Sequence, residues 1–191
     1  LSQYEGKVSG FRVSLNAEPE GDRMLGASFQ RGIRMLADFN FTLDLLVRPH
    51  HLNDCARLAD QFPDQAFVID HLAKPDYSET GFESWARDIE KLSERKNVFC
   101  KISGMVTELP PLDPEADELA IDQYLVYLDQ VLEQFTPQRL MFGSGWPVYT
   151  LTAIFDEVYD IANLYIGKLT AHEQDLIMGE SAGLFYNIKS A

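Results

Sequence analysis

Ionisable, hydroxyl and indole side chains gather where short apolar runs of the sequence end. In parallel α/β folds, polar residues near the carboxyl ends of strands face the substrate. There, cations can hold a carboxylate or stabilise a developing oxyanion, and a histidine can transfer a proton or bind a metal ion. We therefore expect a site for a small molecule. Its candidate residues are Arg12, His71, Lys101, Ser103, Ser144 and Trp146.

His71 and Lys101 are the candidates for chemistry. Side chains alternate along a strand, so His71 is predicted to share a face with Phe67 and Ile69. The same rule allows His71 and Lys101 to point into one interior, where they could act together.

Lys101 lies in the apolar run VFCKIS. A buried lysine is costly unless an anion accompanies it. That anion is either a carboxylate of the substrate or a carboxylate of the protein, for which Asp70 and Glu108 are the candidates. The first alternative makes Lys101 functional and the second makes it structural.

The remaining histidines give no metal signature. His50 and His51 follow Pro49 where a helix is expected, so helix capping or exposure is favoured over metal binding, and His172 is expected to be exposed. The sequence contains no H-x-H, H-E-x-x-H, G-x-S-x-G or G-x-x-x-x-G-K-[ST] motif.

Five β-rich runs alternate with segments of helical period, which predicts a parallel α/β fold. The predicted strands are Gly10–Leu15, Thr42–Val47, Ala66–His71, Val98–Ser103 and Leu140–Ser144. Helices are predicted from the apolar stripes at Leu25–Leu36, Phe82–Leu92 and Tyr124–Phe135, near Thr152–Leu169, and after the capping box of Thr170 and Glu173.

The bulk composition narrows the class of protein. The chain has 191 residues and a net charge of -14, which disfavours nucleic acid and anionic membranes as partners. Cys55 and Cys100 have no CxxC spacing, so reduced thiols and a cytoplasmic location are expected. No apolar run has the length of a membrane helix. The proline-rich loop Thr107–Asp117 is either an active-site lid or a solvated surface loop.

Four segments occur in an order that is typical of one family. They are GFR at Gly10–Arg12, VIDHLAKP at Val68–Pro75, KISG at Lys101–Gly104 and RLMFGSGWPV at Arg139–Val148. With them the chain resembles, from Lys7 to Ile188, the amidohydrolase-2 family of metal-dependent TIM-barrel hydrolases. The nearest subgroup contains fuconolactonase-like and pyrone-dicarboxylate lactonase-like enzymes.

The resemblance implies a (β/α)8 barrel that hydrolyses a lactone or a related bond. It implies that His71 binds a divalent metal, Zn or Mn, or polarises the substrate carbonyl. Lys101 and Arg12 would then hold a carboxylate or hydroxyl groups, Ser103 and Ser144 would contact the substrate, and Trp146 would form a wall of the pocket. The metal is absent from some members of the family.

Two departures from the family pattern bear on activity. The chain lacks the opening His-x-His strand, so residues 1–191 are interpreted as a single barrel domain that lacks the first ~3 βα units. The family turn Gly-Ser-Asp-Trp-Pro reads Gly-Ser-Gly-Trp-Pro here, and Gly145 offers no carboxylate as base or metal ligand.

Three functional interpretations follow. The first is a lactonase-like hydrolase, and the second is a non-catalytic module that binds small acids or acts as a scaffold. The third is an unrelated open α/β sheet. Because an incomplete barrel exposes strand edges, we also expect self-association into a homo-oligomer.

Overall fold

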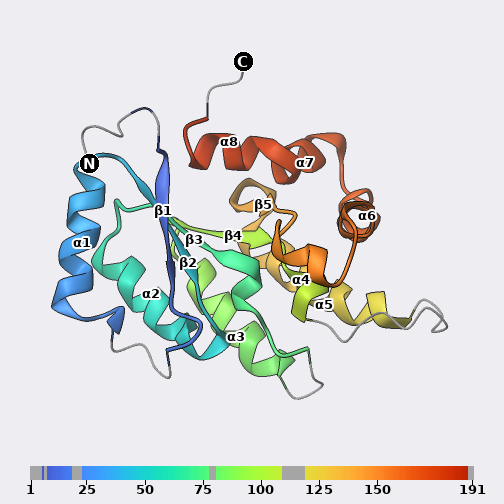
Figure 1. Cartoon of the computed structure of the whole chain (residues 1–191), viewed down its shortest axis with the longest axis horizontal. Helices are drawn as coiled ribbons and strands as arrows, with labels where there is room; N and C mark the ends of the chain where they lie inside the picture. Colours follow the sequence, from blue (N-terminus) through green and yellow to red (C-terminus); the bar gives the residue numbers. More distant parts are fainter. Residues whose placement is uncertain (1–5, 7, 19–22, 78–80, 109–118, 189–191) are drawn as a thin grey trace.

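A computed structural model describes residues 6, 8–18, 23–77, 81–108 and 119–188. Its centre is a sheet of five parallel strands whose spatial order is their order in the sequence (Figure 1). The strands are β1 (Gly10–Ser14), β2 (Thr42–Leu46), β3 (Phe67–Ile69), β4 (Val98–Ile102) and β5 (Leu140–Phe142). All five predicted strands and the parallel α/β class are thus confirmed.

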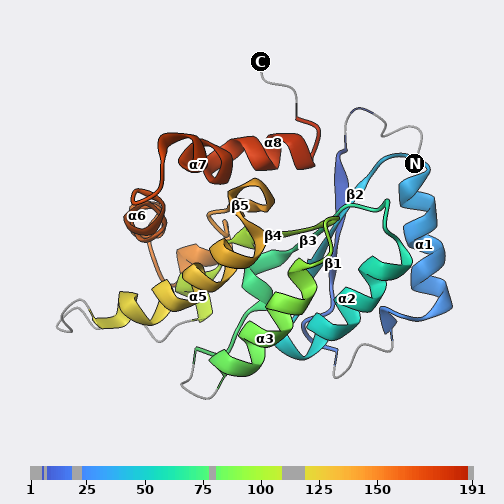
Figure 2. The ribbon, with the colours of Figure 1, turned by 180° about the vertical axis from the view of Figure 1, so that it is seen from behind.

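Four long helices cover one face of the sheet, as Figure 2 shows from behind. They are α1 (Ala27–Ala37), α2 (Leu52–Gln61), α3 (Phe82–Ser93) and α5 (Leu119–Phe135). A fifth long helix, α6 (Phe155–Ile166), contributes Ile161, Ala162 and Tyr165 to the same core. These helices occupy the segments in which the apolar stripes predict them.

Short helical turns join the strands to the long helices. They are η3 (Pro49–His51), η4 (Asp70–Ala73), α4 (Met105–Glu108), η5 (Pro137–Arg139) and η6 (Val148–Leu151). The chain ends in α7 (Ala171–Asp175), the π-helical turn η7 (Leu176–Glu180) and α8 (Ser181–Phe185), which lie above the sheet in Figure 1. The predicted capping box is present, because Thr170 Oγ1 accepts from the Glu173 N–H and Glu173 accepts from the Thr170 N–H.

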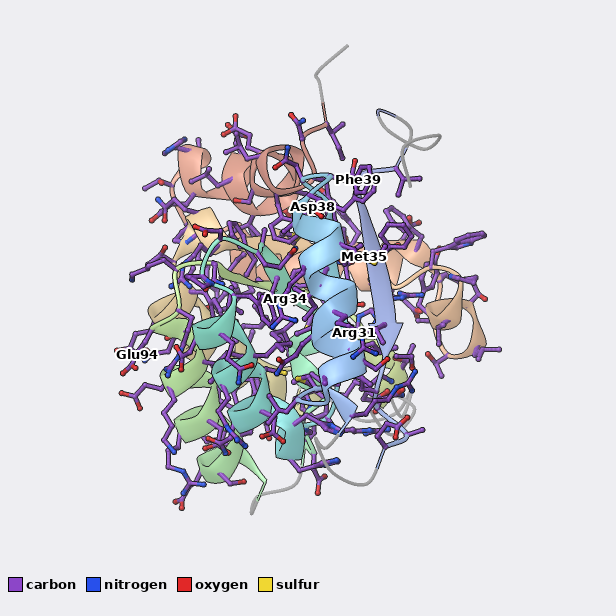
Figure 3. The ribbon with its side chains drawn as sticks, turned by 90° about the vertical axis from the view of Figure 1, so that its left-hand side faces the viewer. Arg31, Arg34, Met35, Asp38, Phe39 and Glu94 are labelled. Carbon is purple, nitrogen blue, oxygen red and sulfur yellow. The ribbon has the colours of Figure 1, made fainter. Side chains whose placement is uncertain are left out.

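Helix α1 shows how the sequence pattern fixes the orientation of a helix. Ile33 is buried against the sheet, whereas Arg31, Arg34 and Asp38 are exposed on the outer face (Figure 3). The apolar residues recur every three or four positions, so they line one side of the helix. The Arg34 guanidinium also lies 5.5 Å from the centre of the Phe62 ring, which links α1 to the end of α2.

The two faces of the sheet carry separate apolar clusters. Phe67 and Ile69 belong to the large core under the helices, whereas Val68 packs with Met141 and Phe185 on the opposite face. We call this opposite side the inner face. The expectation that Phe67 and Ile69 share a face with the interior residue His71 is therefore wrong, because these two side chains point to the helices.

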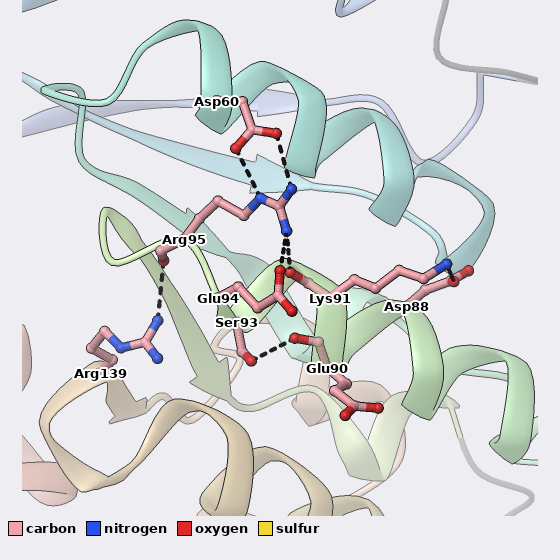
Figure 4. A network of polar contacts seen from close by, with 8 residues as sticks. All are labelled: Asp60, Asp88, Glu90, Lys91, Ser93, Glu94, Arg95 and Arg139. Atoms are coloured by element: carbon pink, nitrogen blue, oxygen red, sulfur yellow. Dashed lines mark hydrogen bonds and ion pairs between the residues drawn. The ribbon is translucent and has the colours of Figure 1, made fainter.

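Arg95 connects several elements at the end of the sheet where the strands begin (Figure 4). Its guanidinium donates to both carboxylate oxygens of Asp60 at 3.0 and 2.9 Å, and Arg139 donates to the carbonyl oxygens of Arg95 and Val98 at 3.2 and 2.9 Å. These bonds connect α2, the end of α3, β4 and η5. Polar groups at this end of a parallel barrel support stability rather than chemistry.

The two cysteines match the sequence-based prediction. Cys55 in α2 and Cys100 in β4 are buried and free. Burial raises the pKa of the Cys100 thiol to about 12, so this thiol stays protonated and unreactive at neutral pH. In the part of the chain that the structure describes, no helix combines the length and the apolar character needed to cross a membrane.

Both outer strands of the sheet leave an edge without a partner among the described residues, since β1 pairs with β2 alone and β5 with β4 alone. Unpaired edges favour pairing with other chains. We expect residues 1–191, when expressed alone, to self-associate. Multi-angle light scattering at micromolar concentrations tests this, and a monodisperse monomer would contradict it.

Candidate active site

Lys101 lies on the inner face of β4 between two carboxylates. Its Nζ atom is 2.6 Å from Asp44 Oδ2 and 2.7 Å from Asp70 Oδ1. Burial disfavours the charged lysine, but the two carboxylates outweigh it and raise the pKa of Lys101 above its ordinary value. Lys101 is therefore a fixed cation, and of the alternatives for its anion the structure shows a protein carboxylate, Asp70, which is the structural alternative.

Arg12 and Tyr186 complete this charged group. Arg12 Nη1 on β1 is 3.7 Å from Asp70 Oδ2, and 60% of the Arg12 side chain is exposed. The Tyr186 hydroxyl, at the end of α8, donates to Asp44 Oδ2 at 2.7 Å, and Lys101 Nζ lies 5.5 Å from the centre of the Tyr186 ring. We call Arg12, Asp44, Asp70, Lys101 and Tyr186 the inner-face charge cluster. Within it, Arg12 is the cation that a ligand can reach most easily.

His71 reaches the site through a turn of unusual hand. The strand β3 ends at Ile69, so strand alternation does not extend to His71. His71, Leu72, Ala73 and Lys74 all have positive φ, at 54°, 55°, 61° and 49°. We call these four residues the left-handed turn. It brings His71 Nδ1 to 2.7 Å from the Ser103 hydroxyl oxygen beyond β4.

The left-handed turn requires support from its surroundings. Left-handed backbone costs L-residues roughly 1–2 kcal/mol each, so four in a row are strained by several kcal/mol. The Lys74 N–H donates to the His71 carbonyl oxygen at 2.7 Å, and the Trp85 indole N–H donates to the Leu72 carbonyl oxygen at 2.8 Å. The Lys74 ammonium also contacts the Glu108 carboxylate.

Gly104 provides the space in which His71 sits. A Cβ atom at position 104 would lie 2.8 Å from both Cβ and Cγ of His71, and Gly104 has φ +73°. The absence of a side chain at Gly104 is therefore a steric requirement for the position of His71.

The pKa of His71 is lowered, first by burial and further by the cations Lys74, Lys101 and Arg12, although Asp70 opposes this shift. His71 is therefore neutral at neutral pH. A neutral imidazole can accept a proton from water or donate one hydrogen bond to a carbonyl group. Because Nδ1 faces Ser103, the nitrogen left for a ligand is Nε2.

Glu108 forms ion pairs with Lys74 and Arg48 rather than with Lys101. Besides Lys74 it binds Arg48, whose Nη1 lies 3.3 Å from Glu108 Oε2, so the alternative pair of Lys101 and Glu108 is wrong. Thr107 and Glu108 form the end of α4, and residues 109–117 of the predicted lid or surface loop lie outside the described residues.

The turn after β5 holds Ser144, Gly145 and Trp146. The Ser144 hydroxyl accepts from the Trp146 N–H at 3.2 Å, and 73% of Trp146 is exposed. Gly145 has φ +76°, and a Cβ atom there would be 3.7 Å from its nearest neighbour, the Gly104 nitrogen. A Cβ atom at this position would therefore make only ordinary van der Waals contact, although the positive φ disfavours most side chains. Substrate contacts of Ser144 and Trp146 remain predictions.

The other histidines lie mainly as expected. His50 and His172 are exposed, and His51 Nδ1 accepts from the Arg48 N–H at 3.2 Å in a capping arrangement. His51 differs from the expectation of exposure because it is fully buried, and burial lowers its pKa.

Over the ranges with described side chains, no three His, Cys, Asp or Glu side chains gather as metal ligands. Divalent transition metals in hydrolase sites need about three protein ligands. These residues therefore do not form a metal site by themselves, and His71 could supply at most one ligand through Nε2.

Two members of the inner-face charge cluster were missed by sequence reasoning. Asp44 is an acid in the apolar run TLDLLV, which is the same kind of signal that Lys101 gives in its own strand. These two residues carry opposite charges, but choosing them as partners needs the strand order. Tyr186 gives no such signal, because it lies 142 positions from Asp44.

Comparison with known proteins agrees with this arrangement. The family model described as Amidohydrolase matches residues 4–188. The chain belongs to the amidohydrolase family. This is the family that the sequence motifs indicated.

The chain spans about two thirds of the length of the relatives that it matches. L-fucono-1,5-lactonase of Burkholderia multivorans is 33% identical over 97% of this chain, which spans 65% of that protein. A Burkholderia multivorans amidohydrolase solved with bound HEPES superposes with a TM-score of 0.91 at 30% identity, covering 98% of this chain and 68% of that one. A Burkholderia multivorans amidohydrolase solved with bound zinc superposes with a TM-score of 0.87 at 32% identity, covering 94% of this chain and 64% of that one.

A more distant structure supports the fold alone. A putative 2-pyrone-4,6-dicarboxylic acid hydrolase of Pseudomonas putida has a TM-score of 0.78 at 19% identity, covering 96% of this amidohydrolase and 64% of that chain. The predicted family is confirmed, and the five-stranded sheet corresponds to part of a TIM barrel.

Lys101→Met tests the inner-face charge cluster. The change leaves Asp44 and Asp70 buried without their shared cation, so we expect the free energy of unfolding to fall by about 3–5 kcal/mol. Chemical denaturation of the intact protein measures this. Adding Asp70→Asn should recover part of the loss, and an unchanged stability in Lys101→Met would contradict the arrangement.

Gly104→Ala tests whether His71 needs the space that Gly104 leaves. A methyl group there combines a clash with His71 and unfavourable φ, and we expect a loss of stability of about 1–3 kcal/mol. Gly32→Ala in α1 is the matched control, because nothing lies within 4 Å of its Cβ position. That control should be neutral or stabilise by up to about 1 kcal/mol. Equal denaturation midpoints of both variants would rule out the steric requirement.

Proposed function

We propose that the protein carrying this chain is a hydrolase that opens a lactone or related cyclic ester of an acidic or polyhydroxylated small molecule. The observation that carries the proposal is the exposed cation Arg12 near a neutral His71 at the carboxyl ends of the strands, an arrangement that the ion pairs of Lys101 with Asp44 and Asp70 stabilise. The likeness to L-fucono-1,5-lactonase supports the same class of substrate.

Each residue has a role that follows from its position. Arg12 is exposed enough to hold a carboxylate or hydroxyl groups of the substrate. Lys101 stays charged and is paired with Asp70, the residue before His71, so it fixes the position of the site rather than binding the substrate. His71 presents Nε2, which can polarise the carbonyl group or accept a proton from the attacking water. No step is assigned to a metal ion.

A second function is favoured by Gly145. The family carries aspartate at this position as base and metal ligand, and Gly145 has no side chain to do either. The site would then bind sugar acids or dicarboxylates without turning them over. Both functions use Arg12 as the anion-binding group, so only turnover separates them.

Three further features belong to the proposal. Residues 1–191 form a single, incomplete barrel domain within the functional protein. That protein assembles as a homo-oligomer, and it acts in the cytoplasm, where its buried thiols stay reduced.

Replacing Gly145 by aspartate separates the two functions. Gly145→Asp introduces a carboxylate on a Cβ atom that makes only ordinary van der Waals contact, and aspartate tolerates left-handed backbone better than most residues. In the intact protein, assayed on a panel of sugar and dicarboxylate lactones with and without Zn²⁺ or Mn²⁺, we expect its rate to exceed that of Gly145 by about 10²–10⁴-fold.

Gly145→Asn is the matched control, because asparagine has the same shape and tolerance of positive φ but cannot act as a base. Equal rates for the aspartate and asparagine variants would remove this acid from the mechanism. If the unmodified protein shows no turnover while calorimetry detects sugar-acid binding, the binding function replaces the hydrolase.

A further inference from the structure

We propose that Trp85 is a positioning residue for His71, and that it acts by holding the left-handed turn through the hydrogen bond from its indole N–H to the Leu72 carbonyl oxygen. The inference rests on the proposed function for the role of His71. It does not need that function for the geometric link itself, which runs from a core residue of α3 to the site.

The residue types of the turn do not explain its hand. Leucine, alanine and lysine disfavour positive φ, and histidine, which adopts it more often, accounts for only one of the four positions. The local Lys74-to-His71 bond closes the turn but leaves its hand unspecified, because both bonded groups belong to the turn. Contacts from outside must therefore select this hand.

Several contacts from other described elements reach the turn, and they differ in solvent exposure and in the part of the turn that they bind. The ion pair of Lys74 with Glu108 lies at the solvent-facing end, where each side chain is 17% exposed. The Ser103 hydroxyl contacts the ring of His71 rather than the backbone. At the middle of the turn, the Trp85 indole binds the Leu72 carbonyl oxygen and the Cys100 thiol of β4 contacts the Leu72 backbone; Trp85, Cys100 and Leu72 are all almost fully excluded from water.

Burial makes the Trp85 bond selective for one backbone arrangement. The Leu72 carbonyl group has no water with which to replace its partner, so a turn of the other hand would leave it unpaired in the core. Trp85 is in turn fixed by its neighbours, since its ring centre lies 4.9 Å from that of Tyr127 and 6.0 Å from that of Phe82. The position of the indole therefore defines the position of Leu72 and, one residue earlier, of His71.

The experiment removes the indole N–H from the intact protein. Trp85→Phe keeps an aromatic ring in the core, and 3-benzothienylalanine at position 85 keeps the full ring shape with sulfur in place of the N–H group. With selectively labelled histidine, the nuclear Overhauser effect between the His71 ring and the Ser103 β protons is measured. We expect it to be lost or clearly weakened in both variants.

Kinetics provide a second readout wherever turnover is detected. We expect kcat to fall about 10–100-fold while KM changes by less than about threefold, because the reacting group is misplaced while Arg12 still holds the substrate. Ser181→Ala is the matched control, since it removes a buried hydroxyl that donates to the Pro137 carbonyl oxygen at 3.0 Å, near the start of β5. This control should leave both the Overhauser effect and kcat unchanged.

An intact His71–Ser103 Overhauser effect in the benzothienylalanine protein would overturn the inference, whatever the activity. The same effect lost equally in Ser181→Ala would also overturn it, because general loosening would then explain the change. Loss confined to the position 85 variants supports positioning even if no lactone is hydrolysed, so failure of the proposed function remains distinguishable.

Discussion

The inner face of this amidohydrolase depends on one ammonium group held between two carboxylates. Lys101 lies on β4, while Asp44 lies on β2 and Asp70 directly follows β3, so their contacts connect three strands through side chains. Arg12 adds β1, and Tyr186 adds the end of α8. In surroundings of low dielectric such a group is stable only when every charge has its partner, so the position of each member constrains the others.

The left-handed turn complements this cluster from the adjoining segment. Asp70 is the last residue before the turn, and its carboxylate is 1% exposed, while the next residue, His71, bends back toward Ser103. Strained backbone persists where surrounding structure over-determines it, and this often happens at functional sites. The two features together place a fixed cation and a neutral imidazole close to each other with little freedom to relax.

Local pattern was enough to predict the strands, most helices and the requirement of Lys101 for an anion. Apolar runs and periodic stripes reflect burial, which acts residue by residue, so they can be read from one sequence. The partner Asp44 lies 57 positions from Lys101, and choosing it needs the strand order that only the structure supplies. The route of His71 was not predictable, because the three residues that follow it, Leu-Ala-Lys, disfavour positive φ. Trp85, which supports that route from another helix, gave only an ordinary core signal.

The sequential order of the strands has a consequence for how the chain folds. Each strand pairs with the next one along the sequence, so each pairing closes only one short segment of chain. Contacts of low sequence separation form at low entropic cost and therefore early. The hydrogen bond between Tyr186 and Asp44 spans 142 positions and belongs to the opposite extreme. The sheet can thus assemble by stepwise addition of strands. The hydrogen-bond partners of the inner-face charge cluster are complete only when the end of α8 reaches β2.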